Sequence, residues 1–111
     1  MNNDRYVTMD RDIAEIRLAH GSDDDIRETL VSISLNDADR AWVQEKLIRF
    51  ASHPSWSVRA VAATCFGHLA RIHGALDLGE VLVCMKALLD DPLTADYARN
   101  AMNDIRRYVR E

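Results

Sequence analysis

The sequence feature that most constrains the fold is an internal repeat built around two prolines. Pro54 and Pro92 lie 38 residues apart, and apolar residues recur at this offset before them and at an offset of 39 after them. The matching positions are Val43, Leu47 and Phe50 with Val81, Met85 and Leu88 before the prolines, and Val58, Ala62, Phe66 and Leu69 with Tyr97, Ala101, Ile105 and Tyr108 after them. A one-residue insertion after the second turn explains the change of offset. Self-similarity at such a period indicates stacked supersecondary units.

Within and around these units, apolar residues recur every three or four positions, which is the period of an amphipathic helix. The chain has only four glycines, two prolines and seven aromatic residues, so it lacks the turn chemistry that an all-β fold needs. We therefore expect an all-α chain of five to six helices. The expected helices span about residues 9–19, 22–35, 38–52, 55–73, 78–89 and 91–110.

Each expected helix has an apolar stripe and recognisable ends. The two N-terminal stripes are Ile13, Ile16 and Ala19 or His20 in the first helix, and Ile26, Leu30 and Ile33 in the second. Ser22 is placed to cap the second helix, with Asp25 completing a capping box. Asp37 is placed to cap the third helix, and Gly74 to end the fourth.

The most specific motif is the segment at residues 53–63, which reads HPSWSVRAVAA. It resembles the HEAT-repeat family, whose pattern is Asp-Pro, then Val-Arg, then Ala-Ala. His53 stands where that family has Asp, and the second unit has Asp91-Pro92 but Tyr97-Ala98 in place of Val-Arg. The resemblance covers about residues 22–111 and is strongest at 38–73.

This resemblance implies a short HEAT-like α-solenoid. We expect one HEAT-like helical domain over residues 1–111, with helix-pair units at about 38–73 and 77–110 and a partial unit at about 9–35. A terminal repeat needs a polar outer face. Val61 and Cys65 of the inner unit become Asn100 and Asp104 in the last unit, so we expect the array to be complete and the chain to be the whole protein.

The net charge of −4 is confined to the first half of the chain. Residues 1–53 contain eleven acidic and seven basic side chains, whereas residues 54–111 contain seven of each. Nucleic-acid binding depends on clustered lysine and arginine, so we expect no direct binding of nucleic acid. An acidic surface attracts a basic protein partner, although a solvated surface without a dedicated ligand has the same composition.

No motif indicates catalysis, a metal or a cofactor. The histidines lack a convergent nucleophile or carboxylate. Cys65 and His68 are only two ligands where a structural zinc site needs four, so Cys65 and Cys84 are expected to be free thiols packed as small apolar residues. The longest strongly apolar run, Val81 to Met85, is too short to span a membrane. The polar N-terminus predicts no secretory signal, and hence a cytoplasmic protein.

The second helices of successive solenoid units form a continuous binding surface, here the helices at 22–35, 55–73 and 91–110. Trp42 is expected to pack in the core, whereas Trp56 either anchors a partner or folds over the turn against the preceding helix. Ala63 is expected on the same outward surface as the binding residues. The residues expected to contact a partner are Asp23, Asp24, Asp25, Glu28, Trp56, Arg59, Arg99 and Asn103.

The chain also looks like the small, acidic HEAT-like proteins that neutralise toxin domains in bacterial competition. That likeness implies a non-enzymatic immunity protein, a monomer or one half of a 1:1 complex, which binds and occludes a basic toxin domain. A nuclease is one candidate for that toxin. The alternative is a scaffold or adaptor that binds a peptide or helix of a cellular complex along the same surface.

Overall fold

The computed structural model describes residues 8–110, which fold into six α-helices. The polar N-terminal stretch at residues 1–7 lies outside the described residues. The helices are α1 (Arg11–His20), α2 (Asp23–Asn36), α3 (Arg40–Phe50), α4 (Trp56–His73), α5 (Leu78–Asp90) and α6 (Ala95–Tyr108). The chain is all-α, as predicted.

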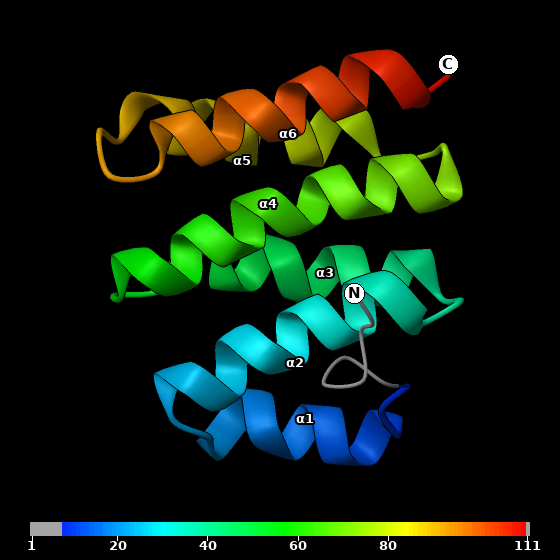
Figure 1. Ribbon diagram of the computed structural model, residues 1–111, viewed down its shortest axis with the longest axis vertical. Helices are drawn as coiled ribbons and strands as arrows, with labels where there is room; N and C mark the ends of the chain where they lie inside the picture. Colours follow the sequence, from blue (N-terminus) through cyan, green and yellow to red (C-terminus); the bar gives the residue numbers. More distant parts are fainter. Residues whose placement is uncertain (1–7, 111) are drawn as a thin grey trace, which may run out of the picture.

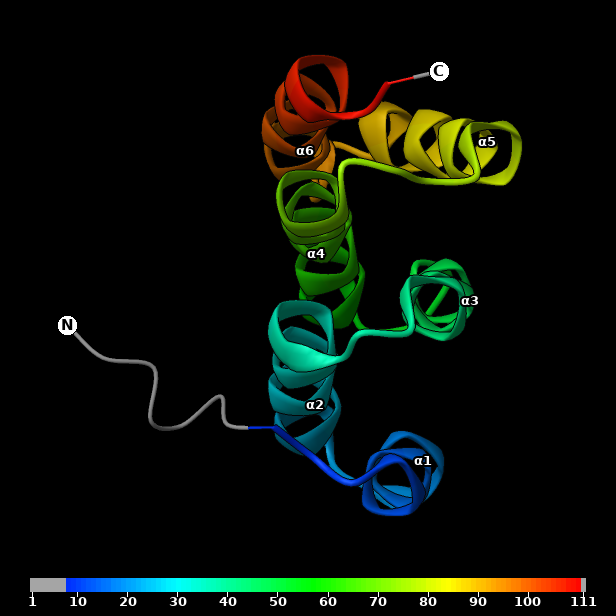
Figure 2. The same ribbon diagram turned by 90° about the vertical axis from the view of Figure 1, so that its right-hand side faces the viewer.

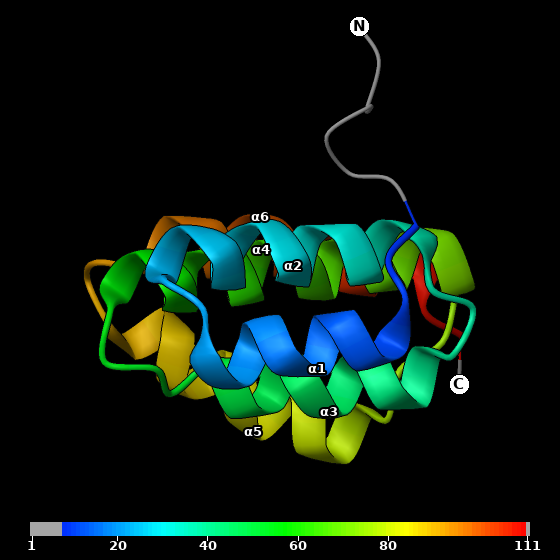
Figure 3. The same ribbon diagram turned by 90° about the horizontal axis from the view of Figure 1, so that it is seen from below.

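The helices form two layers (Figures 1 to 3). The even-numbered layer consists of α2, α4 and α6, which stack directly on one another, and the odd-numbered layer consists of α1, α3 and α5 (Figure 2). Successive pairs repeat along one axis, so the fold is a short HEAT-like α-solenoid of six helices, as predicted. Its extents of 31 × 29 × 28 Å make it as wide as it is tall.

The core is centred on α4, the longest helix. The predicted stripe of Val58, Ala62, Phe66 and Leu69 is completely buried, which confirms that part of the repeat. Small residues surround the stripe, so α2 and α6 pack against α4 from opposite sides. The expectation that Ala63 faces outward is therefore wrong, because a helix with neighbours on both sides buries a wider arc, and Ala63 is fully buried.

Within the even-numbered layer, α4 and α6 come close together at Gly67. A Cβ atom at this position would lie 2.8 Å from the Oδ2 atom of Asp104 and 3.4 Å from the Cα atom of Ala101. The absence of a side chain at Gly67 is thus what lets α6 lie so close to α4.

Most helix ends follow the sequence signals; the starts of α3 and α6 do not. Ser22 and Asp25 form the predicted capping box of α2, and Gly74 ends α4 with a positive φ of 64°. The prediction that Asp37 caps α3 is wrong: α3 begins at Arg40, and the side chain of Asp39 accepts the hydrogen bond of the capping position. The Asp37 carboxylate instead accepts a hydrogen bond from the Asp39 N–H, 2.8 Å away, and so shapes the turn before the helix.

The predicted stripe of α1 is also wrong. Ala14 and Leu18 are buried, whereas 53% of Ile13 and 62% of Ile16 is exposed. Both sets of residues have helical spacing, so the periodicity could not choose between them. The choice was made by packing, because α1 ends the stack and has neighbours on one side only.

The N-terminal part of α6 differs from the repeat as well. Tyr97 was matched to the core residue Val58 but is exposed, and Ala98 is buried in its place. The reason is the turn at residues 91–94, which delays the start of α6 to Ala95. Buried Thr94 holds this turn by donating a hydrogen bond to the carbonyl oxygen of Leu88 at 2.7 Å.

We predict that Phe66→Ala lowers the free energy of unfolding by about 3–5 kcal/mol, because it leaves a cavity in the helix that contacts both neighbours. Ile72→Ala, on the same helix but half-exposed, is the matched control and should cost less than about 1 kcal/mol. Urea titration measures both values. Equal losses for the two variants would contradict a core centred on α4.

We also predict that the two thiols are poorly reactive in the folded protein. Burial raises the pKa of Cys65 to about 12 and that of half-buried Cys84 to about 11, so both stay protonated near pH 8, and only the thiolate attacks a disulfide reagent. Reaction with Ellman's reagent should be slow in buffer, with Cys84 the faster thiol, and rapid in urea. Rapid labelling of both thiols without denaturant would contradict this.

Candidate protein-binding surfaces

The residues predicted to bind a partner lie mainly along one edge of the solenoid. We call it the turn edge and define it as the turns and first helical turns at 21–28, 53–59 and 91–97. The N-termini of α2, α4 and α6 all lie at this edge, on the left in Figure 1. In each helix pair the chain reverses direction at this edge, so the three turns follow one another along the solenoid.

A ladder of polar contacts ties the turns together. Arg59 donates hydrogen bonds to the carbonyl oxygens of His53 at 2.9 Å and Pro54 at 3.0 Å, and to the Asp91 carboxylate at 3.1 Å. The Leu93 N–H and the Arg59 guanidinium lower the pKa of Asp91. Arg59 therefore joins the second turn to the third, and its contact with a partner stays a prediction.

The first turn joins the second in a similar way. Arg27 donates a hydrogen bond to the Ser57 hydroxyl at 2.7 Å, and the Nε2 atom of His53 lies 3.9 Å from a carboxylate oxygen of Asp23. His53, which replaces the family's Asp, also accepts a hydrogen bond from the Ser55 N–H. The His53 ring thus stabilises the turn before α4, although it departs from the HEAT pattern at this position.

The four predicted acidic residues are partly neutralised by arginines. Arg17 lies 3.4 Å from the Asp25 carboxylate and 3.1 Å from that of Glu28, and Arg27 pairs with Asp24. Asp23 and Asp24 are exposed, whereas Asp25 and Glu28 are half-buried. The cluster keeps a net negative charge, because four carboxylates face two guanidinium groups.

The remaining predicted residues are spread over the even-numbered layer. Trp56 begins α4 and is 45% exposed. Arg99 and Asn103 are exposed on α6, where Arg99 pairs with Asp96, and Asn103 accepts a long hydrogen bond from Arg106 at 3.5 Å. The structure therefore brings the acidic residues close to Trp56 along the turn edge, while Arg99 and Asn103 extend the surface along α6.

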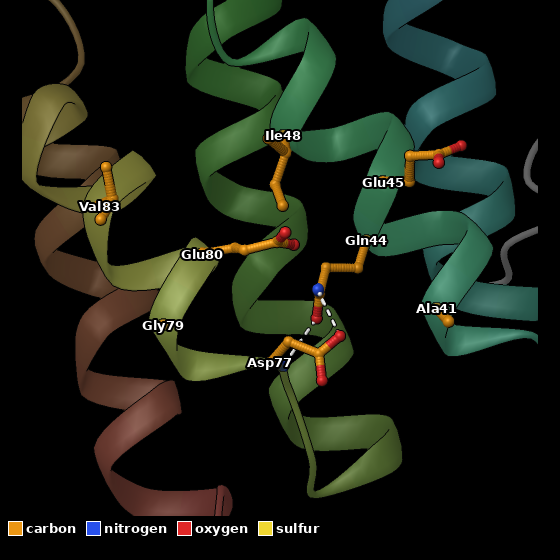
Figure 4. A pocket seen from close by; sticks show the side chains of 8 residues that line it. All are labelled: Ala41, Gln44, Glu45, Ile48, Asp77, Gly79, Glu80 and Val83. Carbon is orange, nitrogen blue, oxygen red and sulfur yellow. Dashed lines mark hydrogen bonds between the residues drawn. The ribbon is translucent and has the colours of Figure 1, made fainter.

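A groove that the sequence did not predict lies on the opposite layer, between α3 and α5 (Figure 4). Its volume is about 600 Å³. Its apolar lining consists of Ala41, Ile48, Gly79 and Val83, and its polar lining of Gln44, Glu45, Asp77 and Glu80. We call it the α3–α5 groove. The Glu80 side chain reaches across it toward Ile48, while Glu45 lies on the rim with its carboxylate turned away (Figure 4).

Buried Gln44 forms a fixed floor for this groove. Its amide nitrogen donates to the Asp77 carboxylate at 3.0 Å, and its amide oxygen accepts from the Asp77 N–H at 2.9 Å. One signal for the groove was present in the sequence: the helix at 78–89 has apolar residues on every side, which is typical of a helix that is covered all round. Only Val81, Met85 and Leu88 are buried by the chain itself.

The corresponding space between α1 and α3 is smaller, about 230 Å³, and is crossed by side-chain contacts. Glu15 accepts hydrogen bonds from the Lys46 ammonium at 2.7 Å and from the Trp42 ring N–H at 3.0 Å. The hydrogen bond from Lys46, and then that from Trp42, lowers the pKa of Glu15. Trp42 thus packs at the edge of the core, with the Arg11 guanidinium 4.3 Å from its ring centroid.

Comparison with known proteins agrees with this architecture. The family model for the HEAT repeat matches residues 43–73, which cover most of α3, the turn and all of α4. The chain contains a HEAT repeat. Its fold resembles that of a chain in the CDI complex from Cupriavidus taiwanensis LMG 19424, with a TM-score of 0.85, 28% sequence identity and 97% of each chain covered. A comparison with curated proteins gives no significant match.

The histidines and cysteines around the HEAT repeat do not converge on a reactive centre. No group of three or more His, Cys, Asp or Glu side chains within residues 8–110 is arranged to hold a metal ion. Burial and the nearby Arg71 lower the pKa of His68.

No helix of the described residues is long and apolar enough to cross a membrane.

We predict that Glu15→Gln destabilises the protein at neutral pH and has little effect in acid. The folded-state pKa of Glu15 is lowered, so its stabilising contribution is present above the unfolded-state value near pH 4 and is lost as the pH falls through the folded-state value. Because Glu15 is partly exposed, the loss at pH 7 should be only about 1 kcal/mol. Urea titrations at pH 7 and below pH 3 measure it, and a loss that grows in acid would contradict it.

Proposed function

We propose that this protein is a non-enzymatic, cytoplasmic immunity protein that neutralises a basic toxin domain by binding it and covering its active surface in a 1:1 complex. The observation that carries the proposal is the likeness to a chain of a CDI complex, which extends over 97% of both chains. CDI abbreviates contact-dependent growth inhibition, a competition between bacterial cells in which a toxin is paired with an immunity protein.

The fold and the charge distribution support binding rather than catalysis. Stacked helical repeats offer extended surfaces for partners, and this chain carries a net charge of −4. A basic toxin domain is attracted to such a surface at long range, and burial of matched charges then discriminates against wrong partners. The HEAT repeat at 43–73 supplies the rigid centre on which these surfaces are arranged.

The turn edge is one contact surface that we propose for the toxin domain. Asp23, Asp24, Asp25 and Glu28 supply its negative charge, and half-exposed Trp56, the first residue of α4, supplies an apolar anchor at the next turn. Arg99 and Asn103 extend the surface along α6. Arg59 joins the turn before α4 to the turn before α6 through its hydrogen bond to Asp91.

The first experiment is capture of the native partner with a tagged copy of the chain at moderate salt, followed by mass spectrometry. One stoichiometric basic protein, whose toxicity in cells is relieved by co-expression of this chain, would support the proposal. Capture of several subunits of a cellular complex would favour the adaptor, whose binding of an apolar helix should depend weakly on salt. No captured protein, or a toxic partner that is not relieved, would overturn the proposal.

For the captured partner, we predict that Asp23→Asn/Asp24→Asn lowers the association rate constant about fivefold at low salt, because steering by charge acts on association. Asp25 is unsuitable for this test, since it closes the capping box of α2. Stopped-flow or surface plasmon resonance measures the rate, and the difference should shrink at high salt.

A matched pair of single variants controls for charge and helix position. Asp24 and Asp12 are both the second residue of a helix, and both are exposed. Asp24→Asn should slow association, whereas Asp12→Asn, which changes the net charge equally, should not. Equal effects of the two variants would remove the turn edge from the contact surface.

A further inference from the structure

We propose that the α3–α5 groove is a second docking site, which takes a basic segment of a protein partner. An arginine or lysine of that segment would lie against Glu80, and its aliphatic neighbours would cover Val83 and Ile48. The identity of the partner as a toxin rests on the proposed function, but the chemistry of the groove does not.

The first argument is the uncovered apolar surface of α5. Val83 is 75% exposed and Leu82 is 42% exposed, on a helix whose residues are apolar or glycine apart from Glu80, Lys86 and Asp90. Val83 lines the groove, where half-buried Ile48 of α3 forms the opposite wall (Figure 4). Adjacent apolar walls of this kind lose contact with water when a partner is seated between them.

The second argument is the charge of the groove. Among residues 8–110, the Glu80 carboxylate, which reaches across the groove, forms no ion pair or side-chain hydrogen bond (Figure 4). Glu45 is likewise unpaired, but its carboxylate is turned away on the rim. At the floor, Arg40 forms an ion pair with Asp77 at 3.7 Å and donates a hydrogen bond to the Gln44 amide oxygen at 3.1 Å. Between α1 and α3, Lys46 neutralises the carboxylate of Glu15. The chain therefore supplies cations to Glu15 and Asp77, and within the described residues it supplies none to Glu80.

The third argument is that the groove is open and its floor is fixed. Gln44 is only 3% exposed and holds Asp77 through two hydrogen bonds, so the floor needs no rearrangement before binding. A Cβ atom added at Gly79 would meet no other atom within 4 Å. A partner's side chain can thus reach the backbone of the first turn of α5.

These features together define the occupant. An aliphatic ligand would leave the Glu80 carboxylate unpaired, and a free cation would leave Val83 and Ile48 exposed. A protein segment with arginine or lysine beside leucine, isoleucine or valine satisfies both parts of the lining, and arginine has the geometry for two parallel hydrogen bonds to one carboxylate.

The test uses the full chain, labelled with ¹⁵N, and a synthetic probe: an end-capped amphipathic peptide that carries arginines and leucines four residues apart. We expect saturable shifts of amide signals from residues lining the groove. Glu80→Gln should weaken binding by about tenfold, whereas Glu45→Gln, which removes a carboxylate that is turned away from the groove, should change it little. Shifts that cluster instead on the turn edge, or no saturable shifts, would overturn the proposal.

Two variants at Gly79 separate occupation of the groove from general attraction between charges. Gly79→Trp should fill the groove and abolish the shifts without changing the net charge, and Gly79→Ala should leave them unchanged, since its methyl group projects into open space. Asp12→Asn is the charge control for Glu80→Gln. Unchanged binding of the peptide to a folded Gly79→Trp protein would also overturn the proposal.

The captured partner separates this proposal from the proposed function. Peptide binding in the groove without any toxic partner would overturn the proposed function alone. A toxin that is neutralised equally well by Gly79→Trp and Glu80→Gln, together with a peptide that does not bind, would overturn the groove alone.

Discussion

The packing of α4 against both of its neighbours in the even-numbered layer is the constraint on which the rest of the structure depends. α4 contacts α2, α3, α5 and α6, and only α1 lies beyond its reach. The stripe from Val58 to Leu69 supplies the apolar area. The small residues beside it, among them Gly67 opposite Ala101 and Asp104, allow the neighbouring helices to come near. The segment that matches the HEAT repeat, residues 43–73, thus contains the helix around which the other helices pack.

The two layers differ in how closely their helices are packed. Small residues draw α2, α4 and α6 into a continuous layer, whereas α1, α3 and α5 each rest on the core through one face only. The space between α1 and α3 is crossed by Glu15, Trp42 and Lys46. The space between α3 and α5 keeps its carboxylates and its exposed valine, and it is there that a partner can add contacts.

The distribution of charge follows the same division. On the turn edge, Arg17 and Arg27 hold part of the acidic cluster, and Arg59 serves the turns. Several of the charged residues that were predicted from the sequence to bind a partner therefore also stabilise the turns before α2, α4 and α6. In the α3–α5 groove, Glu80 and Glu45 have no such structural task within the described residues. The two surfaces lie on different faces, so a large partner has two separate acidic regions to recognise.

The sequence by itself determined the all-α class, the repeat, the capping box of α2 and the buried stripe of α4, because each depends on local spacing or on neighbours within one helix. Only the tertiary structure decided which face of α1 is buried, since Ile13 and Ile16 have the same helical spacing as Ala14 and Leu18 and only the position of the next helix distinguishes them. It also decided that Asp39 rather than Asp37 caps α3, and that Ala98 rather than Tyr97 enters the core, because both depend on the path of a turn. The α3–α5 groove was decided by the tertiary structure for a related reason. The apolar residues of the helix at 78–89 could signal an uncovered surface, but the lining of the groove comes from two segments at least 29 positions apart, which the stacking of two repeats brings together.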